Sequence, residues 1–239
     1  MEFAETGDSV WQTGPARLEV GEDEVHVWRA PFGMSDALRE RLSRALEPEE
    51  WTRAERYASP VARDQYLLTR GILRDILARY LPTAPGELRF RRAERGKPEL
   101  EEPPGTGLEF NLSDSGTWVL CAVARGRRVG IDIERIEPRR PLRRLARRFL
   151  AAGEVAALER VGDSELPVAF YSVWTRKEAY LKATGEGLVF PLSRFDVTAP
   201  ESLEGWQFSE VFVGEGYRAA LVVESGGRRI RCWEWAERP

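Results

Sequence analysis

Residues 129–134, Val-Gly-Ile-Asp-Ile-Glu, form the segment that most constrains the fold of this 239-residue chain. Their apolar side chains alternate with Gly130, Asp132 and Glu134, which is the pattern of a strand with one buried face. Residues two apart on a strand lie about 6.5–7 Å apart, so both carboxylates face one small volume. Gly130 leaves room beside them for a backbone or a ligand to approach closely.

A second segment, residues 167–183, has the helical spacing of apolar residues and supplies a third carboxylate, Glu178. Lys177 adjoins it, Lys182 follows one turn later, and Gly185 stands where a helix would end. Three carboxylates with nearby lysines suit a hard divalent cation that holds a polyphosphate. The alternative role of these carboxylates is structural, as caps or as partners of the abundant arginines.

The rest of the chain mixes hairpins with helices. Strand patterns cover residues 24–29, 87–91, 108–112, 117–123, 210–213, 217–223 and 229–233, and helical patterns cover residues 35–46, 48–56, 60–80, 138–150 and 151–158. Residues 113–116, Ser-Asp-Ser-Gly, predict a turn. Together these elements predict an α+β protein. The chain is long for one simple domain and short for two independent ones, so we expect two lobes, residues 1–126 and 127–239, that share one interface.

Basic residues outside the acidic segments are candidate phosphate ligands. Arg70 and Arg74 lie one turn apart on the predicted helix of residues 60–80 and share a face. Two guanidinium groups on one face can clamp phosphates, although arginines on such a helix more often form a solvated face. The sequence Arg-Gly-Lys-Pro around Lys97 forces a turn that presents the lysine.

Composition excludes several classes of function. The net charge of −3 gives no global field that demands a nucleic acid or a membrane as partner. The two cysteines, Cys121 and Cys232, have no zinc-like spacing and favour a reducing, cytoplasmic setting. The start of the chain lacks the pattern of a signal peptide, and no apolar run approaches the length of a membrane span. The single histidine, His26, has no nucleophile beside it, so a Ser-His-Asp hydrolase is not expected.

Residues 138–150 predict a basic amphipathic helix with six arginines around apolar positions. Such a helix could bind nucleic acid, but no aromatic or glycine residues interleave with the arginines to support that interpretation. The favoured interpretation is a solvated face, or a docking face for an acidic protein that would use Arg143 and Arg147.

Five motifs that occur in order between Pro48 and Phe195 resemble those of the 4′-phosphopantetheinyl transferases of the surfactin-synthetase-activating (Sfp-like) type. They are Gly96-Lys97-Pro98; Phe110-Asn111-Leu112-Ser113-x-Ser115-Gly116-x-Trp118; Val129-Gly130-Ile131-Asp132-Ile133-Glu134; Arg148-Phe149 followed by Glu154; and Phe170-Tyr171-x-x-Trp174-x-x-Lys177-Glu178-x-x-x-x-Lys182 with Gly185-x-Gly187-Leu188. Each motif alone is weak, whereas the ordered set is specific.

The resemblance implies a pseudo-twofold pair of similar lobes, each a small antiparallel sheet packed with helices, with coenzyme A bound in the cleft between them. It implies a monomer that moves 4′-phosphopantetheine from coenzyme A to a serine of an apo acyl, peptidyl or aryl carrier protein and releases adenosine 3′,5′-bisphosphate. Transfers of this kind need in-line positioning and neutralisation of oxygen charge more than covalent help from the protein.

The resemblance also implies roles for individual residues. Asp132, Glu134 and Glu178 would hold Mg²⁺, and Asp132, Glu178 and Lys182 would be catalytic. Lys182 would stabilise the leaving oxygen, and either Glu178 or a metal-bound water would accept the proton of the serine. Coenzyme A would be held by a set of polar and basic residues: Arg53, Arg70, Arg74, Lys97, Ser113, Asp114, Lys177 and Lys182.

One position departs from the pattern. Many relatives carry a histidine after the serine of the second motif, where it meets the 3′-phosphate of coenzyme A, and this chain has Asp114. A carboxylate there would repel that phosphate unless an arginine or a proton intervened. Either discrimination for the 3′-phosphate is relaxed, or a neighbouring basic residue carries it.

Two rival functions stay open: a different magnesium-dependent phosphoryl-transfer enzyme, and a carrier-binding relative that has lost catalysis. The absence of a P-loop and the order of the motifs disfavour the first, and the complete acidic set with Lys182 disfavours the second. Carriers of fatty-acid, polyketide, nonribosomal-peptide and lysine pathways are all compatible with the sequence.

Overall fold

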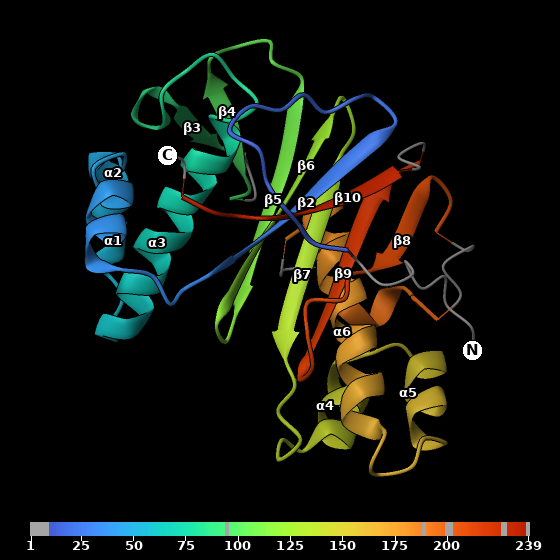
Figure 1. Ribbon diagram of the computed structural model, residues 1–239. Coiled ribbons are helices and arrows are strands. Elements are labelled where there is room, and N and C mark those ends of the chain that lie inside the picture. The colour runs from blue at the N-terminus through green and yellow to red at the C-terminus, as the bar shows by residue number, and fades with distance from the viewer. Residues whose placement is uncertain (1–9, 94–95, 188–189, 199–202, 226–228, 238–239) are drawn as a thin grey trace.

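The computed structural model describes residues 10–93, 96–187, 190–198, 203–225 and 229–237. Two larger sheets lie next to each other, and each has its own group of helices, one group at either side of the molecule (Figure 1). The predicted α+β class is confirmed. None of the helices in the described part is long and apolar enough to cross a membrane.

The first half of the chain builds a sheet covered by a long helix. Its elements are β1 (Gln12–Thr13), β2 (Glu24–Pro31), α1 (Asp36–Ser43), α2 (Pro48–Ala54), α3 (Pro60–Leu77), η1 (Pro85–Glu87), β3 (Arg89–Arg92), β4 (Pro98–Glu102), β5 (Leu108–Ser115) and β6 (Trp118–Arg125). Ser59 caps α3, its hydroxyl accepting a hydrogen bond from the backbone of Ala62, and a proline follows at the first helical position. The buried face of α3, including Ile72 and Ile76, packs with Trp28 of β2 in one core.

The second half repeats this plan around another long helix. Its elements are β7 (Val129–Arg135), α4 (Leu142–Phe149), α5 (Ala152–Glu159), α6 (Leu166–Thr184), η2 (Leu192–Arg194), β8 (Trp206–Glu210), β9 (Tyr217–Glu224) and β10 (Arg229–Glu234). Helix α6 ends at Gly185, which has a φ of 75° and confirms the predicted C-cap. The predicted Gly185-x-Gly187-Leu188 motif continues beyond this point, and its Leu188 lies outside the described residues.

The two halves share one topology. In each, a first strand is followed by three α-helices, of which the third is the longest, and later by a hairpin, β5–β6 or β8–β9; the first half adds the separate β3–β4 hairpin in between. The second strand of the hairpin pairs antiparallel with the first strand, so the strand orders β2-β6-β5 and β7-β9-β8 correspond. This correspondence confirms the expected pair of similar lobes.

Strand β10 departs from this repeat. It pairs parallel with β2, on the edge opposite to β6, and β1 adds beyond it. Residues at the end of the predicted second lobe therefore belong to the sheet of the first, where they cover an edge that would otherwise be open. The division into residues 1–126 and 127–239 stays a prediction.

Three local predictions were displaced. Strand β5 continues through the predicted turn as far as Ser115, and the turn is made by Gly116 and Thr117 alone. Helix α4 begins at Leu142 rather than at residue 138, because prolines precede it at 138 and 141. The strand predicted at residues 210–213 shares only Glu210 with β8, because the segment that pairs with β9 is Trp206–Glu210.

Candidate active site

Strands β5 and β7 are joined by side chains, although they belong to different sheets. The side-chain oxygens of Asn111, Ser113 and Ser115 accept hydrogen bonds from backbone N–H groups of β7 at 2.8, 3.3 and 3.0 Å. The donors are, in that order, Ile131, Ile133 and Arg135. Because both strands repeat every two residues, every second residue of β5 meets every second amide of β7. This ladder explains the Asn-x-Ser-x-Ser spacing, and Asn111 and Ser115 are members to which the sequence alone assigned no role.

The same serines bind the acidic residues of β7. Ser113 donates its hydroxyl hydrogen to Oδ1 of Asp132 at 2.8 Å, and Ser115 donates to Oε2 of Glu134 at 3.1 Å. The prediction that the two carboxylates occupy one side of the strand therefore agrees with their contacts. Both are held by the neighbouring lobe.

Lys182 reaches this point from helix α6. Its Nζ donates to Oδ1 of Asp132 at 2.7 Å, to the hydroxyl of Ser113 at 2.9 Å and to the carbonyl of Ile131 at 3.2 Å. Helix α6 can come this close because Gly130 has no side chain: a Cβ there would lie 2.0 Å from the carbonyl oxygen of Ala179. The close approach expected at Gly130 is that of the α6 backbone.

Three carboxylates interact electrostatically around Lys182. The pKa of Glu178 is raised to about 7, first by burial and then by the charges of Asp132 and Glu134, which outweigh Lys182. Burial and the Asp132 charge likewise raise the pKa of Glu134. The charges of Asp132 and Glu134 therefore act on Glu178 across the space between β7 and α6.

The donor chemistry of this cluster suits a hard cation. Among the residues that the structure describes, Oδ2 of Asp132 is buried without a hydrogen-bond partner, and the neighbouring ligand atoms are carboxylate oxygens, which Mg²⁺ prefers. Within the ranges that the structure describes, no three His, Cys, Asp or Glu side chains stand close enough together to hold one metal ion. Asp132, Glu134 and Glu178 thus fit Mg²⁺ in kind, and binding would require them to move together.

Lys177 is directed elsewhere. Its side chain is fully buried, and its Nζ pairs with the equally buried Glu154 at 2.6 Å and also donates to the carbonyl of Phe195. Glu154 in turn accepts from the backbone of Val197 at 2.9 Å, so the pair ties α5 and the segment after η2 onto α6. The expectation that Lys177 contacts coenzyme A is therefore corrected: it has no exposed surface with which to do so.

A pocket of about 610 Å³ lies in the first lobe, between α2, α3 and the β3–β4 hairpin. Arg53 and Arg70 line it together with Tyr66 and Phe90, and four more arginines belong to its wall: Arg56, Arg89, Arg91 and Arg92. The carboxylates of β7 and α6 are not part of this wall. Such a pocket suits an anionic ligand with a planar or apolar part.

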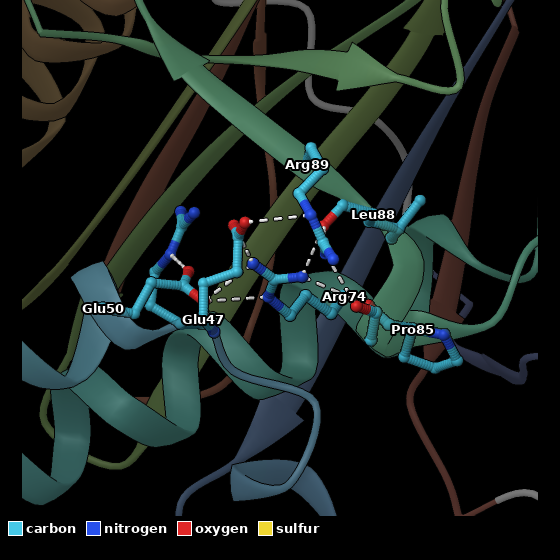
Figure 2. Close-up of polar contacts among 8 residues, drawn as sticks. Glu47, Glu50, Arg74, Pro85, Leu88 and Arg89 are labelled. Atoms are coloured by element: carbon cyan, nitrogen blue, oxygen red, sulfur yellow. Dashed lines mark hydrogen bonds and ion pairs between the residues drawn. The ribbon is translucent and has the colours of Figure 1, made fainter.

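Arg74 does not share this surface. Its side chain is fully buried, and its guanidinium group binds Glu47, Glu50 and the carbonyls of Pro85 and Leu88. The prediction that Arg74 contacts phosphate is therefore corrected, because each of its nitrogens is already bonded inside the lobe (Figure 2). Helical spacing predicts that Arg70 and Arg74 share one face of α3, but it does not predict how deeply each side chain is buried.

Lys97 connects the pocket with the acidic cluster. Its neighbour Pro98 lines the pocket, whereas its own Nζ donates to the carbonyl of Val129 at 3.1 Å, at the first residue of β7. Burial lowers the pKa of Lys97 and outweighs the nearby charges of Glu109 and Glu99. Asp114 lies between the two serines of the ladder, with its side chain exposed.

Comparison with known proteins agrees with this arrangement. Residues 128–229 match the family described as the 4′-phosphopantetheinyl transferase superfamily, and residues 35–126 match the description 4′-phosphopantetheinyl transferase, N-terminal. The chain is 36% identical over 233 residues to the 4′-phosphopantetheinyl transferase HetI of Nostoc sp., covering 94% of this chain and 98% of that protein. It is 31% identical over 164 residues to the 4′-phosphopantetheinyl transferase Sfp of Bacillus subtilis, covering 69% and 71% of the two chains. The protein therefore belongs to the 4′-phosphopantetheinyl transferase superfamily.

Proposed function

We propose that this transferase moves 4′-phosphopantetheine from coenzyme A to a serine hydroxyl of an apo carrier protein, with Mg²⁺ as cofactor and adenosine 3′,5′-bisphosphate as second product. The observation that carries the proposal is the cluster of Asp132, Ser113 and Lys182 on the seam between the lobes, with Glu178 and Glu134 coupled to it. A diphosphate needs cationic and hydrogen-bonding groups of this kind beside the reacting phosphorus.

Coenzyme A would span the distance from the arginine pocket to this cluster. Its nucleotide half suits the pocket, where Arg53 and Arg70 offer guanidinium groups and Tyr66 offers a ring. Lys97, in the residue before β4, and Ser113 of β5 both contact β7, through the carbonyl of Val129 and the side chain of Asp132. The pantetheine arm would then extend from the cluster toward the carrier.

Residues of this chain would handle the charges and the proton of the reaction. The serine oxygen of the carrier forms a bond to the phosphorus next to pantetheine while the bond from that phosphorus to the bridging oxygen breaks. Lys182 would donate to the departing phosphate oxygen. Either Glu178 or a water molecule would accept the proton of the serine. Mg²⁺, held by Asp132, Glu134 and Glu178, would neutralise the diphosphate oxygens.

The basic helix α4 is the proposed docking face for an acidic carrier. The residues proposed to contact the carrier differ from Arg143 and Arg147, which the sequence suggested. Arg143 donates to the carbonyls of Leu158 and Val161 and pairs with Asp163, and Arg147 pairs with Glu159. Arg144 and Arg148 of α4 are exposed and form no such ion pair with any residue in the described part of the chain. Exchange of these two for glutamate should raise the KM for the carrier and leave the affinity for coenzyme A unchanged.

The direct test is to mix the protein with coenzyme A, Mg²⁺ and a panel of apo carrier proteins, and to follow the intact mass of each carrier. A phosphopantetheine adduct that disappears with EDTA and in Glu178→Ala would support the proposal. Release of phosphate or nucleotide without any carrier adduct would favour another magnesium-dependent phosphoryl-transfer enzyme. Coenzyme A binding with no adduct on any carrier would favour a non-catalytic carrier-binding relative. We further propose that the protein is cytoplasmic and monomeric; its sedimentation behaviour would test the monomer.

A further inference from the structure

Arg70 and Arg74 lie one turn apart on α3 but have different surroundings. Arg74 is fully buried behind the pocket, whereas Arg70 lines the pocket. Both guanidinium groups lie 4.9 Å from the ring of Phe90. The two arginines are therefore not equivalent ligands of one anion.

A chain of alternating charges connects them (Figure 2). Glu50 lies between the arginines: its Oε1 accepts from Nε of Arg70 at 2.6 Å, and its Oε2 accepts from Nε of Arg74 at 2.9 Å. Arg74 then binds Glu47 at 2.6 Å, and Glu47 pairs with Arg89 at 3.4 Å. Burial alone would raise the pKa of Glu50, but Arg70, the backbone amide of Glu47 and Arg74 together lower it, so this carboxylate stays charged.

This arrangement fixes the direction of Arg70. Among the described residues, the hydrogen bond to Glu50 engages Nε, while the two terminal nitrogens of Arg70 have no such partner. Phe90 packs against the guanidinium group and limits its rotation. A planar pair of nitrogens held in this way matches two oxygens of one phosphate.

Stability alone does not account for the arrangement. Burying an ion pair carries a desolvation penalty that often exceeds the attraction, and apolar residues of similar volume would serve the core equally well. The buried Arg74 does have a geometric effect, because it binds the start of α2 through Glu47 and the approach to β3 through the carbonyls of Pro85 and Leu88. It thereby sets the separation between two walls of the pocket.

We propose that Glu50, held by the buried Arg74, is a positioning residue that aims the terminal nitrogens of Arg70 at a phosphate in the nucleotide half of coenzyme A. The inference rests on the proposed function and divides the expected arginine pair into one contact residue and one supporting residue. Glu50 acts on the ligand only through Arg70.

The test compares Arg70→Gln, Glu50→Gln and the double variant, with Arg63→Gln as a charge-matched control from the exposed side of α3. Loss of a charged hydrogen bond predicts a rise of about tenfold to hundredfold in the KM for coenzyme A for Arg70→Gln, with kcat nearly unchanged. Glu50→Gln should raise the KM less, and it should add nothing in the Arg70→Gln background. Thermal unfolding checks that each variant is folded.

Several outcomes would overturn the inference: an unchanged KM in Arg70→Gln, a fall confined to kcat, or additive effects of the two substitutions. Calorimetry with adenosine 3′,5′-bisphosphate separates this failure from failure of the proposed function. Weaker binding by Arg70→Gln than by the wild type and Arg63→Gln supports the role of Arg70, whether or not a carrier is modified. Equal binding by all of them, or no binding by the wild type, refutes that role.

Discussion

Ser113 connects the two lobes to the reactive cluster through one hydroxyl group. It donates to Asp132 at 2.8 Å and accepts from Nζ of Lys182 at 2.9 Å, while the backbone amide of Ile133 also donates to it at 3.3 Å. A residue of β5 therefore sets the positions of Asp132 on β7 and Lys182 on α6. The geometry of the cluster depends on the packing of one lobe against the other.

Ser113→Ala should reduce both stability and activity. Loss of its buried hydrogen bonds should lower the free energy of unfolding by about 1–3 kcal/mol and kcat/KM by tenfold or more, because Asp132 and Lys182 lose their shared partner. Thr106→Ala is the control, since its hydroxyl accepts from the backbone of Leu108 outside the cluster. Normal activity in Ser113→Ala, measured by carrier mass, would contradict this role.

Gly130→Ala should destabilise the protein strongly. The added Cβ would lie 2.0 Å from the carbonyl oxygen of Ala179 and 2.5 Å from the backbone nitrogen of Ala183, so α6 would have to move away from β7. We expect a loss of about 3 kcal/mol or more in chemical denaturation. Gly33→Ala is the matched control because a Cβ there meets no atom within 4 Å. Equal stability of the two variants would show that α6 does not depend on this close approach.

The Lys177–Glu154 pair should behave as a structural unit. Lys177→Met alone leaves Glu154 buried without its cation and should lower the free energy of unfolding by about 3–5 kcal/mol. The double variant Lys177→Met with Glu154→Leu removes both charges and should recover most of this loss. Transfer activity of the folded double variant should remain near that of the wild type. Loss of activity in a folded double variant would show that Lys177 or Glu154 has a role in the reaction beyond stability.

His26 should make the protein sensitive to mild acid. Burial lowers its pKa to about 4 from 6.5, against the raising effect of Glu24 and with a further lowering by Arg231. His26 is therefore protonated near pH 6.5 in the unfolded chain, whereas in the folded protein it stays neutral until the pH falls to about 4. Stability should fall as the pH drops through this window, by at most about 3 kcal/mol from this group.

His26→Gln tests that contribution because an amide oxygen can still accept from the hydroxyl of Tyr80, which lies 2.8 Å from Nδ1 of His26. Denaturation curves at several pH values should show wild type and variant converging as the pH falls from 6.5 toward 4. Carboxyl groups other than Glu24, which interacts with His26, titrate in both proteins and cancel in the difference. A difference in stability that does not change with pH would contradict the lowered pKa.

The sequence by itself predicted which faces carry the acidic residues, and its resemblance to a family predicted two similar lobes. Alternation along residues 129–134 and helical spacing before Glu178 place their carboxylates on definite faces, since strand and helix have fixed periods. The glycine between the apolar residues of that strand was enough to predict a close approach. Periodicity and motif order therefore led to the superfamily without tertiary information.

The tertiary structure alone decided how deep each charged residue lies and which strands pair across long separations. Arg70 and Arg74 look alike in sequence, yet Glu47 and the turn before β3 enclose only the second. Lys177 and Glu178 are adjacent, yet one pairs with Glu154 and the other faces Asp132. Helical spacing specifies the direction of a side chain from the helix axis, whereas its burial depends on which other segments pack there. Strand pairing depends on tertiary structure in the same way: β10 pairs with β2, a strand some two hundred residues earlier in the chain.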